Sequence, residues 1–439
     1  MTMGRIVDVQ DRLPLGRALP LSAQHMFAMF GSTVMVPFLT GLDPSVALFT
    51  GGLGTLLYIL LTKGKIPAYL GSSFAFIAPI LAVSKAQGMG EALFGAAMSG
   101  VVYIAVALLI RRFGTAWLEK LLPPIVVGPV VVVIGLSLAG TAVSMAAEGY
   151  LAAVIALAAA MAAMVFFRGF LNVIPILFGI IVGYLYSAAA GQVDWQVVAQ
   201  APWFSLPHFV APKPSTLALW TIAPVALVTI AEHIGHLLVT ENIVRKPLMR
   251  DPGLHRSLLG DGVATVVAGL VGGPPTTTYG ENIGVMAITR VYSMWVIGGA
   301  AVIAMLFAFV GKLGALVHSI PVPVMGGISV LLFGTIAAAG VRMMVEHRVD
   351  FSRPRNLAIA SVVMVLGVGV VGNTVLHLGG LEIGGLALAT FGGMILNAIF
   401  PERKDRESGD RPGSEETGAD LGASRGKSGK GKGEEGALG

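Results

Sequence analysis

The stretch that decides the fold runs from Gly272 to Arg290 and reads GGPPTTTYGENIGVMAITR. Its first half disfavours a membrane helix, because Pro274 and Pro275 lack backbone N–H donors and the three threonines favour extended backbone. Gly280 and Glu281 follow, and the remainder suits a short helix. Non-helical backbone and an acid at membrane depth are tolerated where they line a buried or water-filled site. We therefore expect this stretch to form part of a substrate site.

The composition around this stretch is that of a membrane protein. Of 439 residues, 55% are hydrophobic and 12% are charged, whereas soluble domains carry about 25% charged residues. The chain has no cysteine, which excludes disulfides and thiolate metal sites. The net charge of +5 lies mainly in short loops and the tail and gives no reason to expect a nucleic-acid partner. No cleavage site follows the polar first 18 residues, so we expect no removable signal peptide.

Apolar segments long enough to cross a bilayer, at about 20 residues each, recur along the chain. We predict an all-α polytopic membrane protein with 14 transmembrane segments. The third and tenth segments are weak as helices, because each opens with proline and small polar residues. The predicted segments cover residues 20–40, 43–61, 66–84, 90–110, 122–142, 147–166, 169–189, 216–241, 255–272, 274–290, 293–312, 320–341, 355–373 and 380–399.

The distribution of Lys and Arg predicts the orientation. An even number of segments places both termini on one side, and cytoplasmic loops carry the excess of basic residues. The loops on the side opposite the termini hold three basic residues, Lys85, Lys213 and Lys312. We therefore expect a multi-pass protein of the inner membrane with both termini cytoplasmic. The loops on the side of the termini hold fifteen, namely Lys63, Lys65, Arg111, Arg112, Lys120, Arg168, Arg245, Lys246, Arg250, Arg256, Arg290, Arg342, Arg348, Arg353 and Arg355.

The chain repeats itself. Pro124, Gly128 and Gly135 match Pro323, Gly327 and Gly334 at an offset of 199 residues, and the two broken segments are offset by 207. Seven segments per repeat is an odd number, so the second copy is inverted, although glycine and proline are common enough here to produce coincidences. Paired interrupted segments indicate a transporter's site.

These features divide the chain into five predicted parts. Residues 1–19 form a cytoplasmic N-terminus, 20–190 the first repeat, 191–215 an external loop and 216–400 the second repeat. The tail, 401–439, has almost no apolar residues and is expected to be disordered. It could touch anionic lipid or simply be solvated.

The first broken segment predicts backbone donors for a ligand. Gly71, Ser72 and Ser73 interrupt its apolar run, and Phe74 begins a new one. If a half-helix starts there, its first backbone N–H groups are unpaired and carry the positive end of the helix dipole. They could donate to a carbonyl while an aromatic ring stacks on a flat ligand. The alternative is a proline-kinked span whose phenylalanines face lipid.

Two acids are candidates for the same site. Glu232 and His236 are spaced i, i+4 and share a helix face, and a carboxylate at mid-membrane is costly enough that it usually has a task. Glu281 begins the half-helix of the second broken segment, where the helix N-terminus favours an acid. The alternatives are a structural Glu–His pair and a polar helix cap. Glu241 needs neither, since an ion pair with Arg245 one turn later would satisfy it.

A metal site is not expected. The order Glu232-His233-x-x-His236 differs from the His-Glu-x-x-His arrangement of zinc proteases, and no third ligand is evident. The constellation also lacks a complete catalytic set, so we expect no enzyme.

Two carboxylates, backbone donors and an aromatic ring, without a buried Lys or Arg, suit a small, flat, uncharged ligand with N–H donors beside carbonyl acceptors, such as a pyrimidine dione. Charge-assisted hydrogen bonds to it contribute about 1.5–3 kcal/mol each. Glu232 or Glu281, helped by His236, could also exchange a proton. We therefore expect transport coupled to protons, with no other cofactor.

The motifs resemble those of the nucleobase–ascorbate transporters, the nucleobase:cation symporters, over about residues 12–400. The family signature is Glu281-Asn282-x-Gly284-xxxx-Thr289-Arg290, and the stretches GSSFAF at 71–76 and AEHIGH at 231–236 are similar to the uracil branch.

This resemblance implies a fold of two inverted seven-segment repeats, with core and gate domains, often as a homodimer in lipid. It implies that segments three and ten each carry a short β-strand and a half-helix. It further implies that Glu232 and Glu281 contact the base, that Phe74 and Gly280 give backbone contacts, and that Tyr279 lines the site. Ser73 is counted with the substrate-binding residues, and His236 supports the proton-coupling acids.

The leading hypothesis is a proton-coupled uracil importer that works by alternating access. The alternative within the same class is a purine (xanthine or urate) or broader pyrimidine permease. A different class is an anion exchanger or channel of similar fold, which two acids in the site disfavour.

Overall fold

Long apolar helices dominate the computed structural model, which describes residues 6–370, 376–378 and 381–400. In this part of the chain, six helices are long and apolar enough to cross a membrane, and six more are apolar but 10–17 residues long. The protein is a multi-pass membrane protein of mostly helical fold. The predicted total of fourteen crossings stays a prediction.

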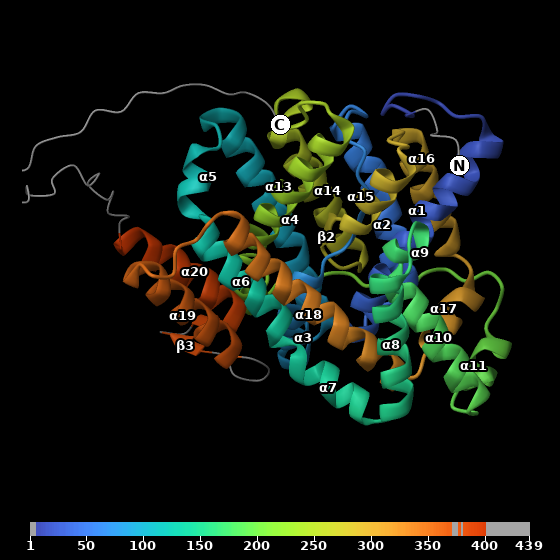
Figure 1. The fold of residues 1–439 in the computed structure, drawn as a ribbon. Helices are drawn as coiled ribbons and strands as arrows, with labels where there is room; N and C mark the ends of the chain where they lie inside the picture. The colour runs from blue at the N-terminus through green and yellow to red at the C-terminus, as the bar shows by residue number, and fades with distance from the viewer. Residues whose placement is uncertain (1–5, 371–375, 379–380, 401–439) are drawn as a thin grey trace, which may run out of the picture. The chain divides into compact units, whose positions relative to one another are not determined.

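One group of helices packs around α14 (Figure 1). Helix α14 contacts α2 and α4, α16 packs on α2, and α1 packs on α16. We call these elements the inner group. They comprise α1 (Leu15–Thr40), α2 (Pro44–Leu61), β1 (Leu70–Ser72), a short turn of helix (Phe74–Phe76), α3 (Ile77–Ala86), α4 (Met89–Phe113), α12 (Thr216–Thr221), α13 (Val225–Val244), a turn at Met249–Gly253, α14 (Leu254–Val271), β2 (Thr276–Thr278), α15 (Gly280–Thr289) and α16 (Met294–Phe307).

A second group packs around α18, which contacts α6, α7 and α8, while α10 packs on α8 and α19 packs on α20 and α6. We call it the outer group. Helices α11 and α17 pack on each other and are given with this group. Their bounds are α5 (Ala116–Leu121), α6 (Pro124–Ser137), α7 (Ala139–Ala147), α8 (Tyr150–Phe166), α9 (Phe170–Val173), α10 (Pro175–Ala189), α11 (Trp195–Gln200), α17 (Gly311–His318), α18 (Val322–Glu346), α19 (Pro354–Gly369), β3 (Leu376–Leu378), β4 (Leu381–Ile383) and α20 (Gly385–Ile399).

The two strands β1 and β2 form a buried antiparallel pair within the inner group. Leu70 pairs with Thr278, and Ser72 pairs with Thr276. The ladder extends beyond the strands, since Tyr279 N–H donates to Tyr69 O at 3.0 Å. Because the preceding prolines cannot donate to a helix, the chain crosses the protein interior here as extended backbone whose polar groups are satisfied by the opposite strand.

The helix boundaries differ from the predicted segments in several places. Predicted segment 122–142 is two helices, α6 and α7, and segment 216–241 is α12 followed by α13. The predicted loop 191–215 contains the short helix α11, and α1 begins at Leu15 rather than at residue 20. Hydropathy marks apolar runs but not the breaks within them, which depend on packing against neighbouring helices. The predicted disordered tail, 401–439, lies outside the described residues.

Three of the four glycines of the predicted repeat, Gly128, Gly135 and Gly327, lie where helices cross closely, whereas a Cβ on Gly334 would meet nothing within 4 Å. A Cβ built on Gly135 of α6 would lie 2.4 Å from Phe333 O of α18, and one on Gly327 of α18 would lie 2.2 Å from Ala153 O of α8. Small residues allow helices in lipid to approach at such distances. These three positions therefore have a packing reason, whatever their origin.

Candidate functional site

Two short helices begin directly after the paired strands. The turn at Phe74–Phe76 leads into α3, and α15 begins at Gly280. Neither Ser73 nor Tyr279, the residues before these helices, caps them with its side chain. Because the strands are antiparallel, the two N-termini lie at opposite ends of the ladder. Their unpaired N–H groups and dipoles provide hydrogen-bond donors within the protein.

Glu281 lies in the first turn of α15 and is half-buried. Its Oε1 accepts a hydrogen bond from Ser32 Oγ of α1 at 2.5 Å. The interaction orients the carboxylate and leaves its other oxygen for a further donor. Neighbouring Asn282 is buried, and its Nδ2 donates to His25 O at 3.0 Å.

Glu232 lies on α13, which packs against α15. It is half-buried, and no described hydrogen bond involves its carboxylate. Because α13 and α15 contact each other, Glu232 and Glu281 lie on neighbouring helices. A half-buried acid without a protein partner is free to accept from a ligand.

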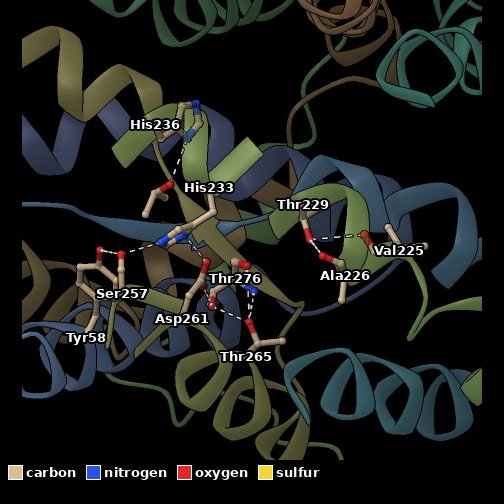
Figure 2. A network of polar contacts seen from close by, with 11 residues as sticks. Tyr58, Val225, Ala226, Thr229, His233, His236, Ser257, Asp261, Thr265 and Thr276 are labelled. Carbon is tan, nitrogen blue, oxygen red and sulfur yellow. Dashed lines mark hydrogen bonds and ion pairs between the residues drawn. The ribbon is translucent and has the colours of Figure 1, made fainter. Parts of the chain in front are cut away.

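His236 takes a partner other than the nearby acid. Its Nδ1 lies 3.0 Å from Thr278 Oγ1 on β2 (Figure 2). A Cβ built on Gly280 would lie 3.6 Å from His236 Nε2, so the imidazole edge faces the start of α15. The expected i, i+4 neighbour of Glu232 is thus tied to the strand rather than hydrogen-bonded to the acid.

Tyr279 joins the two broken segments to α1. Its hydroxyl donates to Ser72 O at 2.9 Å and accepts from Thr33 Oγ1 at 3.3 Å. The ring covers Gly71, where an added Cβ would lie 2.5 Å from its carbons. Ser73 is also buried, and its N–H donates to Pro275 O at 2.9 Å. Phe74 is half-buried. The Tyr279 hydroxyl and the Ser73 amide therefore hold the segments together.

A polar network that the sequence did not reveal lies beneath the strand. His233 Nδ1 is 2.9 Å from Asp261 Oδ2, and both side chains are fully buried. Asp261 Oδ1 accepts from Thr276 Oγ1 of β2 at 3.0 Å. Figure 2 shows this chain of contacts, in which His233 Nε2 also meets Ser257 Oγ at 2.7 Å. The network ties α13, α14 and β2 together.

The expected ion pair of Glu241 with Arg245 is replaced by a hydrogen bond. Glu241 Oε2 accepts from Met249 N–H at 2.7 Å, because the turn after α13 brings that amide back to it. No described group of three or more His, Asp or Glu residues is arranged to hold a metal.

Ser32, Thr33 and Asp261 were missed by the sequence reasoning. Asp261 is an acid between two glycines within a predicted span, and Ser32-Thr33 is a polar pair within another. Asp261, an acid within an apolar run, is as strong a sequence signal as Glu232. Ser32-Thr33 is a weak signal, because Ser and Thr can hydrogen-bond to their own helix backbone.

Comparison with known proteins assigns the chain to a family. The Permease family model matches residues 16–376. The chain is 54% identical to a uracil permease of Bacillus caldolyticus, covering 91% of this chain and 95% of that protein. It is 50% identical to the uracil permease of Escherichia coli (strain K12), with 90% and 94% covered.

Among solved structures, murine Slc26a9, an anion transporter, aligns with a TM-score of 0.67 at 10% identity, over 89% of this chain and 69% of that one. At that identity the likeness concerns the fold alone. The chain therefore belongs to the nucleobase–ascorbate transporter family of permeases, whose members are transporters and not enzymes.

Proposed function

We propose that the protein imports uracil together with protons by alternating access across the inner membrane, with both termini cytoplasmic. The observation that carries the proposal is the placement of two half-buried acids, Glu232 and Glu281, beside two uncapped helix N-termini. The relatives named uracil permease, at 50–54% identity, support the same substrate.

Uracil matches these groups in polarity. Its ring carries two N–H donors and two carbonyl acceptors and has no charge. Glu281, oriented by Ser32, and Glu232 accept from ring N–H groups, while the backbone N–H groups of Phe74 and Gly280 donate to carbonyl oxygens. The Phe74 ring stacks on the base.

Proton coupling requires an acid whose protonation depends on the substrate and on the side from which the site is open. Glu232 and Glu281 are both candidates, because binding a proton to one relieves its repulsion of the other. His236 supports them from its position between Thr278 and Gly280.

The finer architecture belongs to the same proposal. An inverted repeat would bring equivalent strands from the two halves together in antiparallel fashion, and the pairing of β1 with β2 supports it. The inner and outer groups would then serve as core and gate domains. Fourteen crossings, a homodimer and contact with lipid remain predictions.

Two alternatives remain to be tested. A purine or broader pyrimidine permease would use the same polar groups with a differently shaped pocket. An anion exchanger is consistent with the fold of the solved relatives, but two carboxylates in the site oppose an anion.

Uracil binding to purified protein tests the site. Because a charge-assisted hydrogen bond contributes about 1.5–3 kcal/mol, we expect Glu281→Gln to weaken binding by at least tenfold, measured by titration calorimetry. Glu241→Gln is the matched control, since the Glu241 carboxylate accepts from the backbone N–H of Met249, in the turn after α13. Equal affinity of the Glu281→Gln variant and the wild type would remove Glu281 from the site. Displacement of radiolabelled base by xanthine but not by uracil would favour the purine alternative.

A further inference from the structure

A basic pocket opens at the C-terminal ends of α13 and α15. It has a volume of about 530 Å³ and lies between the last turns of α13 and α15 and the N-terminal segment. Its lining residues are Ile6, Asp8, Asn242, Ile243, Val244, Arg245, Lys246, Ala287, Arg290 and Tyr292. The proposed mechanism uses none of them.

The N-terminal segment forms one wall of this pocket. Val7 N–H donates to Arg290 O at 3.1 Å, and Tyr292 N–H donates to Val7 O at 2.9 Å. Asp8 forms an ion pair with Lys246 at 2.6 Å. Backbone hydrogen bonds on both sides of Val291 therefore hold the chain just after α15 against the segment, and the wall is a defined part of the fold.

The charges in the pocket do not cancel. Arg245 and Arg290 are exposed, and among the described residues neither guanidinium has an acidic partner. Three cations and one acid line the pocket, which leaves two positive charges. The C-termini of α13 and α15 contribute about −0.5 each. A net charge of about +1 remains, so the pocket suits an anion of low charge.

We propose that this pocket binds a phosphate group, carried either by a small soluble anion or by a lipid headgroup. Guanidinium groups match phosphate oxygens by paired N–H donors, and here two of them come from the ends of different helices. Basic pockets between membrane helices on the cytoplasmic side bind lipid headgroups, and the orientation in the proposed function places this pocket on that side. Apolar walls, Ile6 and Ile243 among them, accommodate the carbon part of the ligand.

Thermal stability of the full chain in neutral detergent tests the proposal. We expect inorganic phosphate to raise the melting temperature above that in chloride of equal ionic strength. Arg245→Gln and Arg290→Gln should each weaken phosphate binding by tenfold or more, and Arg290→Lys by less. Arg348→Gln is the matched control, because Arg348 shares the positive φ of Arg245 and Arg290 and lies outside the pocket.

Asp8→Asn should have the opposite effect on phosphate affinity, an increase, which misfolding of the variant could not produce. It removes the acid and frees Lys246, so phosphate affinity should rise several-fold. In a parallel arm, nanodiscs of phosphatidylglycerol and of phosphatidylcholine replace phosphate. Stabilisation by phosphatidylglycerol alone identifies a lipid headgroup, and stabilisation by free phosphate identifies a soluble ligand.

The proposal is overturned if neither probe exceeds its control or if the double variant Arg245→Gln/Arg290→Gln responds like the wild type. These assays contain no uracil, so their failure is distinguishable from failure of the uracil site, which the Glu281 titration measures separately.

Discussion

Ser32 and Thr33 are adjacent on α1, and each contacts one residue of the proposed site in the second broken segment. Ser32 donates to Glu281, and Thr33 donates to Tyr279. Helix α1 is thus tied to the second broken segment through two small hydroxyl groups, and we expect the Ser32 hydroxyl to orient the Glu281 carboxylate.

Ser32→Ala should weaken uracil binding by roughly tenfold, because a hydrogen bond to a charged group contributes about 1.5–3 kcal/mol and part of that loss falls on ligand binding. Titration calorimetry measures it. Ser137→Ala is the control, since Ser137 on α6 bonds only to its own helix, at Ile134 O. Unchanged affinity of Ser32→Ala would mean that Glu281 keeps its orientation without this bond.

Gly71 is required by the Tyr279 ring, which lies 2.5 Å from where a Cβ would be. We expect Gly71→Ala to destabilise the protein by about 1–3 kcal/mol and to reduce uracil affinity, because the displaced ring moves Ser72 and the start of α15. Gly140→Ala is the control, as a Cβ there meets nothing within 4 Å. Thermal unfolding in detergent distinguishes them, and equal melting temperatures would contradict the contact.

At the scale of elements, the His233–Asp261 pair holds β2 in place. Strands of three residues have few hydrogen bonds of their own, so the anchor at Thr276 matters for the whole ladder. Because both side chains are fully buried, losing one partner leaves the other without its hydrogen bond in the protein interior.

Asp261→Asn should therefore cost about 1–3 kcal/mol of stability, the range for leaving a buried polar group without its hydrogen-bond partner. Asp251→Asn should cost less than about 1 kcal/mol, because Asp251 and its partner Lys65 are largely exposed, at 65% and 42%. Chemical unfolding of the two variants checks this. Similar small losses would show that the network does not anchor the strand.

The N-terminal segment is a second such element, and its attachment depends on pH. The hydrogen bond from Lys246 holds the pKa of Asp8 below its usual range. Because the folded-state pKa is lowered, the ion pair stabilises the folded state fully above the unfolded-state pKa of about 4. This stabilisation is lost as the pH falls through the folded-state pKa. Both groups are substantially exposed, so the contribution is under about 1 kcal/mol.

Hydrogen exchange at the Val7 and Tyr292 amides reports this contribution. At pH 7 we expect Asp8→Asn to lower protection by up to about fivefold, the factor for 1 kcal/mol. As the pH falls below about 4 and through the lowered folded-state pKa of Asp8, the variant and the wild type should converge, because Asp8 is then protonated in both the folded and the unfolded state. A difference that does not shrink as the pH falls through this range would contradict the ion pair as its cause.

At the scale of the whole molecule, the sequence predicted what depends on burial and local backbone chemistry. Glu232 and Glu281 stood out because charge is rare in apolar runs, and Pro274 with Pro275 predicted extended backbone where β2 begins. What it did not predict depends on distant contacts. The partners of His236, Tyr279 and Asp261 lie on other elements, and no spacing within one segment indicates them.

Helix breaks were missed for a related reason. Segment 122–142 reads as one apolar run, whereas α6 ends at Ser137 and α7 begins at Ala139. Where an apolar helix bends or stops is set by the neighbours that it packs against, and α18 contacts both of these helices.

The most direct test of the central claim is uptake of radiolabelled uracil into proteoliposomes with an imposed pH gradient. Proton-coupled uracil import predicts accumulation when the outside is acidic, collapse of that accumulation on adding a protonophore, and its loss in Glu281→Gln but not in Glu241→Gln. Uptake that is indifferent to the gradient would contradict proton coupling. Absence of uracil uptake, with uptake of another nucleobase or an inorganic anion, would contradict the account as a whole.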